Sequence, residues 1–452
     1  MDKPPRRPPA SAPLRCTPLE SRRVRGAVLA LAAIGWWGAA PVAAQEAAER
    51  VRIASLISKL ASDSYAERDG AHAELSKLGM ATREQLQQAA LSDDAEVRLR
   101  AKDLLRGLAV EELWSAGQVT IHASGTPASA ALETIAGQTG NRLLVGDQYG
   151  SFRDQPVELD YSNAAFWKVV DDLCRQTGNR VRPHYDTRQP GLVLVSGQPG
   201  KNPAAYSGPL RVQVTSARRV FTEELDYENL ESQQTHTFQL DLQALWEDRF
   251  KLVAYRSQAE LIEAITDTGT RLTAAQPASG GWNVAGSGTR QLALSMRLHP
   301  PSTAATRLDT LKLRWDLIAV GDMAQIDVED LESQQPHFQD NVELVIESFK
   351  SGPSQRCEIV LLVVRDLVVP EPQELVFQEN EVHLFDAEGR AFRRQGQTNS
   401  LTPQGARMKI TFTGESANST PKRLRFVYPR IRAQRQMEID LRNVPLPRAR
   451  PE

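Results

Sequence analysis

The 452-residue sequence predicts a multidomain protein of mixed α and β structure: N-terminal helical repeat pairs, then a duplicated β-α-β module, then two C-terminal antiparallel β-sandwiches. Three observations predict this plan. A helical segment repeats after thirty residues, the string Gln-Thr-Gly-Asn-Arg occurs twice, thirty-eight residues apart, and short alternating strands fill the C-terminal half. A chain of this length is long enough for several ordinary domains, each with its own core.

The N-terminus has the layout of a secretory signal peptide, which we assign to residues 1–44. Residues 1–25 are basic and rich in proline, and an apolar run follows from Gly26 to Ala40. Small residues precede Gln45, so the mature chain is expected to begin near Ala44/Gln45. The apolar run is shorter than the roughly 20 residues that span a bilayer. An uncleaved N-terminal anchor is the alternative, and only in that case would the protein be attached to a membrane.

Charge and cysteine content narrow the class of partner. The whole chain carries a net charge of −2 and the leader contributes +5, so the mature chain would carry −7. A mildly acidic exported protein is poorly suited to bind the phosphate backbone of nucleic acid. Cys16 lies in the leader, while Cys174 and Cys357 are assigned to different domains and are expected to be separate, partly buried thiols.

Residues 45–115 are predicted to form two pairs of helices. The blocks that begin at Ser62 and Ser92 share a Ser-Asp start, whose side-chain oxygens suit the exposed N–H groups of a helix start. Ala71, Leu75 and Leu78 form an apolar stripe with the spacing i, i+4, i+7, which recurs thirty residues later. Over about 47–110 this pattern resembles HEAT-type helical repeats. Two pairs are fewer than a free-standing solenoid needs, so we expect a small cap or docking module.

The repeated Gln-Thr-Gly-Asn-Arg string ends each half of a duplicated unit at 117–196. The strand that begins at Val119 matches the strand that begins at Val157, and each is followed by an apolar helical stripe. Gly140 and Gly178 follow the helices, where the chain takes a left-handed conformation that glycine adopts without a Cβ clash. Each string is therefore interpreted as the exit of a β-α-β unit that pairs its strands within a small sheet. A ligand-binding Asn-Arg pair is the alternative. The matching stripe residues are Ala128, Ala131, Leu132 and Ile135 with Phe166, Val169, Val170 and Leu173.

Residues Ala131 to Gly140 and Val169 to Gly178 carry a resemblance to the short N-terminal (STN-like) domain of secretins and TonB-dependent transducers. The resemblance covers 117–196, under a fifth of the chain. In those families the module lies in the periplasm and contacts other proteins. The chain departs from the family pattern beyond residue 196, so the resemblance implies a fold, export and a protein-contact role, without a channel or transport function.

After a linker at 197–208, short alternating strands predict two β-sandwiches of immunoglobulin-like type, at 209–333 and 338–447. The segment from Leu311 matches the segment from Leu424 at an offset of 113 residues, and Asp267 matches Asp386 at an offset of 119. The opening strands of the two sandwiches differ by 132 residues. Such a shrinking offset is what shorter loops in a second copy of one domain produce.

No constellation of residues indicates catalysis, so we assign no catalytic, cofactor-binding or metal-ligating residue and leave the binding residues open. The seven histidines are scattered, and none has the helix-face spacing of a metal site. The string LESQQTH at 230 and its near copy LESQQPH at 331 are interpreted as chance in polar loops, and AGSGTR at Ala285 as a hairpin loop. The acidic cluster of Asp327, Glu329 and Asp330 is interpreted as a solvated strand edge, with a calcium site as the alternative. Core or rim packing is expected of Trp167, Trp246 and Trp315.

These features predict an exported, non-enzymatic scaffold for protein contacts in a bacterial envelope, either periplasmic or secreted, whose partners are other envelope proteins. We expect the main contact at the 117–196 module, because an open sheet edge offers unpaired backbone groups to an incoming strand. The alternative is a periplasmic or surface carbohydrate-binding protein that uses the β-sandwiches. An envelope hydrolase is the third hypothesis.

Overall fold

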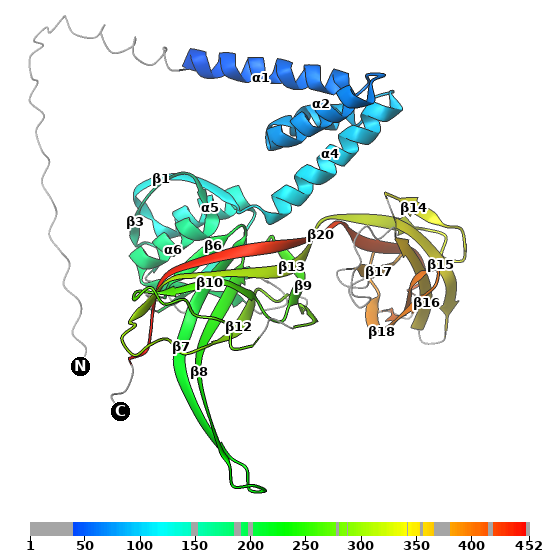
Figure 1. Cartoon of the computed structure of the whole chain (residues 1–452). Helices are drawn as coiled ribbons and strands as arrows, with labels where there is room; N and C mark the ends of the chain where they lie inside the picture. The colour runs from blue at the N-terminus through cyan, green and yellow to red at the C-terminus, as the bar shows by residue number, and fades with distance from the viewer. Residues whose placement is uncertain are drawn as a thin grey trace, which may run out of the picture. The chain divides into compact units, whose positions relative to one another are not determined.

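The computed structural model describes residues 39–145, 152–184, 191–197, 202–276, 280–286, 288–340, 342–352, 356–365, 380–414 and 419–448. Within these ranges the protein is mostly β, with several antiparallel sheets, and it carries helices in its N-terminal part (Figure 1). The chain divides into two compact units, Met1–Ala101 and Lys102–Glu452. The predicted signal peptide lies outside the described residues except for 39–44, which begin the first helix.

The first unit is helical. Its apolar side chains are buried: Ile53 and Leu56 of the first helix, Leu60 directly after it, and Ala71 and Leu75 of the second helix. Its elements are α1 (Ala39–Lys59), α2 (Tyr65–Leu78), the short 3₁₀ helix η1 (Gly79–Thr82), α3 (Arg83–Ala89) and the start of α4 (Ala95–Trp114).

The two loops that lead into α2 and α4 have the same internal contacts. The hydroxyls of Ser62 and Ser92 accept the N–H groups two residues later, at 3.1 and 3.2 Å. The guanidinium groups of Arg68 and Arg98 donate to the Ser62 and Ser92 carbonyls, both at 2.6 Å. The helix caps differ from the expected Ser-Asp pairs. Ser64 caps α2, and Asp94 accepts the N–H of Glu96 at 2.8 Å at the start of α4, because the predicted serines close the loops instead.

The 117–196 region places two helices against two small sheets. The first strands of the two predicted units pair with each other, β1 antiparallel to β3, and β5 lies between β2 and β4 in a second sheet. The expectation that each β-α-β unit pairs its own strands is therefore wrong: β1 pairs with β3 and β2 with β5 between the units, while β4 and β5 pair as a hairpin within the second half. The elements are β1 (Gln118–Pro127), α5 (Ala128–Thr139), β2 (Leu143–Val145), β3 (Pro156–Ala165), α6 (Phe166–Thr177), β4 (Asn179–His184) and β5 (Gly191–Ser196).

Both helical stripes of this region face one core, as predicted. Leu132 and Ile135 of α5 and Val170 and Leu173 of α6 are buried in the same hydrophobic cluster. Both helices end on glycine in the left-handed region, Gly140 at φ 67° and Gly178 at φ 66°. These left-handed glycines confirm the predicted helix exits. A residue with a Cβ would be strained at these angles.

In the described ranges the remaining strands form three sheets around two large hydrophobic cores, with a small third cluster on β9 and β13. One four-stranded sheet has the order β12-β8-β7-β6, one five-stranded sheet has the order β14-β15-β16-β19-β18, and a six-stranded sheet carries β9, β10, β11, β13, β17 and β20. The strands of the first sheet are β6 (Ala204–Ser207), β7 (Leu210–Leu225), β8 (Ser232–Trp246) and β12 (Gln291–Leu298). Those of the second are β14 (His337–Gln339), β15 (Val342–Ser351), β16 (Arg356–Arg365), β18 (Arg393–Thr402) and β19 (Gly405–Thr413). Those of the third are β9 (Lys251–Arg256), β10 (Glu260–Thr266), β11 (Trp282–Val284), β13 (Arg307–Val328), β17 (Glu381–Asp386) and β20 (Pro421–Pro445).

The two long strands β13 and β20 serve both cores. They pair antiparallel over nearly their whole length, with Leu311 opposite Leu441 and Val328 opposite Leu424. The first half of β13 and the last half of β20 line the core under β7 and β8, and their other halves line the core under β15 and β16. The predicted limits 209–333 and 338–447 therefore do not coincide with the cores. Strands of 22 and 25 residues are longer than one sandwich layer needs. The alternation of burial breaks where each strand passes from one core to the other, at Leu317–Val320 in β13 and at Tyr428–Pro429 in β20.

Candidate functional site

The glutamines of the two Gln-Thr-Gly-Asn-Arg strings form hydrogen bonds to the backbone of strands β1 and β3. The Gln138 side-chain amide accepts the N–H and donates to the carbonyl of Thr120, both at 2.8 Å. Gln176 makes the same two bonds to Glu158, at 2.8 and 2.7 Å. A side-chain amide with one acceptor and one donor takes the place of a neighbouring strand here. These two glutamines occupy part of the β1–β3 edges, where we expected an incoming partner strand.

The asparagines of the two strings have different surroundings. Asn141 is 1% exposed and donates from its side chain to the carboxylate of Glu247 at 2.9 Å. The same carboxylate accepts the Gly117 N–H at 2.8 Å and the Arg249 guanidinium at 2.7 Å. Asn179 instead donates to the nearby Thr177 carbonyl. The first string therefore links the 117–196 region to the sheet that carries β8, and both strings have structural roles.

The other residues considered from the sequence are placed apart. The side chains of Trp167, Trp246 and Trp315 are buried, which confirms core packing. Asp327 forms an ion pair with Arg425 at 2.8 Å, and the hydrogen bond from this arginine lowers the pKa of the Asp327 carboxyl. The stretch from Ala285 to Arg290 is not the expected hairpin loop, because β11 pairs with β9 and β12 pairs with β8, in different sheets.

The predicted thiols are separate. Cys174 and Cys357 are both buried, in different core clusters, with no disulfide between them. Burial raises the pKa of the Cys174 thiol to about 12. The histidines also remain apart: His122 contacts Asp160 at 2.6 Å, and the ring of His236 lies edge-on to Phe221. Within the described ranges, no three His, Cys, Asp or Glu side chains gather in a way that would hold a metal ion.

A polar groove of about 780 Å³ lies between α6, β4 and the outer face of the β6-β7-β8-β12 sheet. Asp171 accepts hydrogen bonds from Tyr206 at 2.7 Å and from the Arg211 guanidinium at 2.7 Å, and burial together with this carboxylate raises the pKa of Tyr206. A row of side-chain hydrogen bonds continues across the sheet at 2.7 to 3.0 Å. It runs through Arg211, Gln213, Gln243 and Gln291. The groove is therefore lined by a connected row of amide and guanidinium groups.

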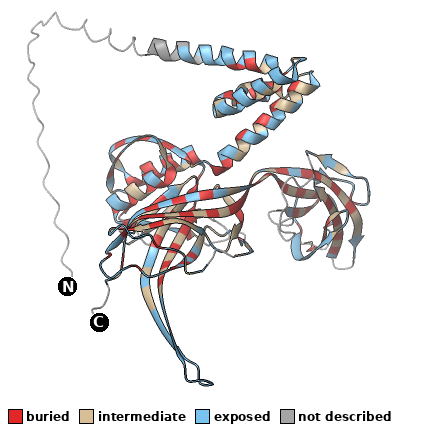
Figure 2. Cartoon of the chain, in the orientation of Figure 1, coloured by how far each residue is buried: buried red, intermediate tan, exposed pale blue. Residues whose placement is uncertain are grey.

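A fully exposed feature of the second unit is the outer part of the β7–β8 ladder. Figure 1 shows these strands extending beyond their sheet as a two-stranded ribbon, and Figure 2 shows its far end to be exposed. All residues from 221 to 236, which we call the ribbon tip, are exposed. The tip is held by its ladder, from Phe221 opposite His236 to Leu225 opposite Ser232, and by the Asp226 N–H, which donates to the Glu231 carbonyl at 2.9 Å.

The ribbon tip combines acidic charge with exposed apolar side chains. Phe221, Leu225, Tyr227 and Leu230 are 57%, 44%, 83% and 72% exposed. Lysine and arginine are absent from residues 221–236, whereas five acidic residues lie there: Glu223, Glu224, Asp226, Glu228 and Glu231. Leu230 adopts φ 58°, a left-handed conformation that costs a leucine about 1–2 kcal/mol. A ribbon outside a core buries little surface of its own, so these side chains are available for a partner.

Comparisons with known proteins supply no family. No family model matches the chain, and no curated protein matches it. One solved structure is similar over part of the chain, described as "The crystal structure of the conserved domain protein from Bacillus anthracis". It shares 10% sequence identity with a TM-score of 0.17, over 52% of this chain and 89% of that chain. Among the helices of the described ranges, none is both long and apolar enough to cross a membrane.

Proposed function

We propose that the protein is an exported, non-enzymatic scaffold of a bacterial envelope, which binds another envelope protein through its ribbon tip. The observation that carries the proposal is the exposure of four large apolar side chains on a segment that also holds five acidic residues. Binding would remove this apolar surface from water, and burying one leucine or phenylalanine side chain contributes about 1.5–3 kcal/mol. The complementary partner surface is basic, with an apolar hollow at its centre.

The domain plan belongs to the same proposal. We assign residues 45–115 to HEAT-like helical repeats, 117–196 to an STN-like module, and the C-terminal half to two immunoglobulin-like sandwiches. The equal contacts of Ser62 and Ser92, and those of Gln138 and Gln176, support internal duplication. The strands β13 and β20 would belong to both sandwiches, because neither core is complete without both strands.

Site-specific photo-crosslinking of the full chain tests the contact. A benzophenone amino acid replaces Tyr227 at the ribbon tip, and a control variant carries it in place of Phe338. The two aromatic residues are 83% and 72% exposed, so both probes are readily accessible. We expect a crosslinked partner protein in the host bacterium from position 227 and not from position 338. Crosslinks to the same protein from both positions, or from 338 alone, would contradict the assignment of the contact to the tip.

Export is tested on the same protein. Sequencing the N-terminus of the periplasmic or secreted form is expected to begin near Gln45. An intact leader on membrane-bound protein would replace cleavage with anchoring, and it would leave the ribbon contact untouched.

The second candidate function is carbohydrate binding in the polar groove. The linked side chains of Arg211, Gln213, Gln243 and Gln291 support it, because amide and guanidinium groups suit sugar hydroxyls. Tyr206 lines the groove and is 42% exposed, which offers one aromatic ring for stacking. Glycan binding that is lost in Gln243→Ala and retained after the ribbon tip is shortened would favour this candidate.

A further inference from the structure

The sheets that carry β7 and β15 match strand by strand, except at one edge. A β-bulge follows Val214 where β7 pairs with β8, and a bulge follows Ile346, 132 residues later, where β15 pairs with β16. β12 then pairs with β8 as β19 pairs with β16, with Leu294 opposite Leu242 and Met408 opposite Leu361. The second sheet has one strand more, because β18 covers the outer edge of β19.

The chain segments that follow β10 and β17 begin in the same way. The turn after β10 and the turn after β17 have the same hydrogen bonds 120 residues apart: Gly269 N–H donates to Thr266, and Gly389 N–H donates to Asp386. Asp386 therefore occupies the position that Thr266 has in the first turn. The sequence match pairs Asp386 with Asp267 instead, which lies one residue later. Ala274 then lies opposite Leu298 on β12, as Arg394 lies opposite Phe412 on β19.

After that point the two paths separate. Residues 393–402 continue along β19 as strand β18. The corresponding segment after Ala274 instead leaves β12 for the six-stranded sheet. At Gly280 it already contacts that sheet, because the Gly280 carbonyl accepts a hydrogen bond from the guanidinium of Arg256 in β9 at 3.2 Å. The strand that completes the second sheet is therefore missing beside β12.

The outer edge of β12 presents backbone groups without a strand partner. The Arg297 carbonyl accepts the Ala275 N–H at 2.9 Å, so the backbone groups of Arg297 point away from β8. Because these groups alternate along an antiparallel strand, those of Gln291, Ala293 and Ser295 point outward too. In the described part of the chain, no backbone hydrogen bond reaches these three residues from that side.

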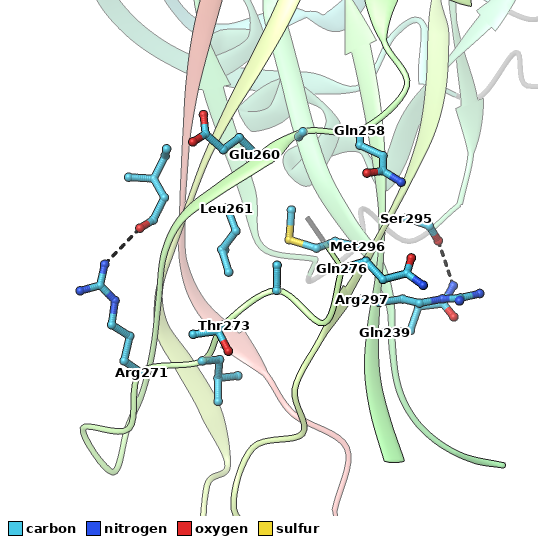
Figure 3. A pocket seen from close by; sticks show the side chains of 14 residues that line it. Gln239, Gln258, Glu260, Leu261, Arg271, Thr273, Gln276, Ser295, Met296 and Arg297 are labelled. Carbon is cyan, nitrogen blue, oxygen red and sulfur yellow. Dashed lines mark hydrogen bonds between the residues drawn. The ribbon is translucent and has the colours of Figure 1, made fainter. Parts of the chain in front are cut away.

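A hollow of about 690 Å³ lies beside this edge, where the two sheets of the sandwich open. Figure 3 shows Leu261 and Met296 inside it, between Arg271 on one side and Ser295 and Arg297 on the other. Arg271 donates to the Ile262 carbonyl at 3.3 Å, which holds one wall in place. The interior of the hollow is thus apolar and its rim is polar and charged.

We propose that the edge of β12 binds an extended segment of a partner polypeptide as a fifth strand of this sheet. The main-chain bonds would repeat those that β18 makes to β19. Gln397, Asn399 and Leu401 of β18 lie on the core-facing side of the sheet, opposite the buried Ile410, Met408 and Ala406, and are themselves exposed. Over the apolar hollow at Leu261 and Met296, apolar residues at these alternate positions fit better. The occupant is therefore a segment with apolar residues at every second position, and its site is separate from the ribbon tip.

The test uses the purified mature chain and two fluorescein-labelled peptides. The first has the sequence of β18, residues 393–402, and the second carries Gln397→Val and Asn399→Val. Fluorescence polarisation is expected to show saturable binding of both, at least threefold tighter for the valine peptide because it covers the hollow. Methylating the peptide nitrogens of Thr398 and Ser400, which point at the neighbouring strand, is expected to abolish binding. Methylation at residues 397 and 401, which alternate with Thr398 and Ser400 in the regular part of the ladder and point away, is expected to leave it within twofold.

Ala293 provides the matched protein variants. Its N–H points outward, so Ala293→Pro removes a donor needed by an added strand and none of the bonds to β8. We expect Ala293→Pro to weaken binding at least tenfold with an unchanged circular dichroism spectrum, and Ala293→Val to bind within twofold of the native chain. Absence of saturable binding, or equal binding by the proline variant and by the methylated peptides, would overturn the proposal. A native dimer that Ala293→Pro converts to a monomer would overturn it in favour of a second copy of this chain.

Discussion

The buried carboxylate of Glu247 links the 117–196 region to the sheet that carries β8, and removing its charged partner Arg249 tests this link. This side chain is 0% exposed and accepts hydrogen bonds from Gly117, Asn141 and Arg249 at 2.7 to 2.9 Å. Arg249→Met removes the only formal positive charge among these donors and keeps a stem of similar length. The carboxylate would then be buried with two neutral donors.

The size of the effect follows from the burial of the pair. Removing one partner of a buried ion pair costs about 3–5 kcal/mol, because the other charge stays buried without compensation. The Arg249 side chain is 24% exposed, so water can replace part of its interaction, and we expect the lower end, about 3 kcal/mol. Arg218→Met is the control, since Arg218 pairs with Asp241 at 3.1 Å with 57% of its side chain exposed. Such surface pairs contribute about 0–1 kcal/mol.

Urea denaturation followed by tryptophan fluorescence measures both variants, because Trp114 and Trp167 are buried within this unit. The free energy of unfolding is expected to fall by about 3 kcal/mol in Arg249→Met and by less than 1 kcal/mol in the control. Equal losses in the two variants, or a loss below 1 kcal/mol in Arg249→Met, would refute the reasoning that Glu247 depends on its buried partner.

Three further outcomes are expected. Val170→Asp places an unpaired carboxylate in a fully buried position, so thermal denaturation should reveal a loss of several kcal/mol, and an unchanged melting temperature would disprove the assigned face. Cys174 and Cys357 should not react with Ellman's reagent at pH 8 until the chain is unfolded, because both are buried and the pKa of Cys174 is raised to about 12; rapid reaction of the native protein would argue against this packing. The hydrogen bond from Ser232 lowers the pKa of the Glu223 carboxyl below its ordinary value of 4.5. This hydrogen bond should therefore persist above pH 4.5 and be lost only as the pH falls through the lowered pKa. An NMR titration midpoint of the Glu223 carboxyl above 4.5 would contradict this.

Local features of this protein were predictable from the sequence. The stripes of α5 and α6 were readable because their spacing repeats with the helix period, and their residues are buried in one core. The glycine helix ends at Gly140 and Gly178 were readable because few other residues adopt a left-handed conformation without strain. The burial of Trp167, Trp246 and Trp315 followed from their places in periodic segments.

Long-range features were decided only by the tertiary structure. Asn141 and Asn179 stand in identical five-residue strings, yet only Asn141 meets a carboxylate, 106 residues away in the chain. The two segments that match from Leu311 and Leu424 were read as equivalent parts of separate domains, and they are antiparallel neighbours that complete both cores. The exposure of the ribbon tip and the unpaired edge of β12 were likewise decided only by the tertiary structure. Periodicity records which face of a strand is apolar, whereas the choice of neighbouring strand depends on contacts between residues far apart in the sequence.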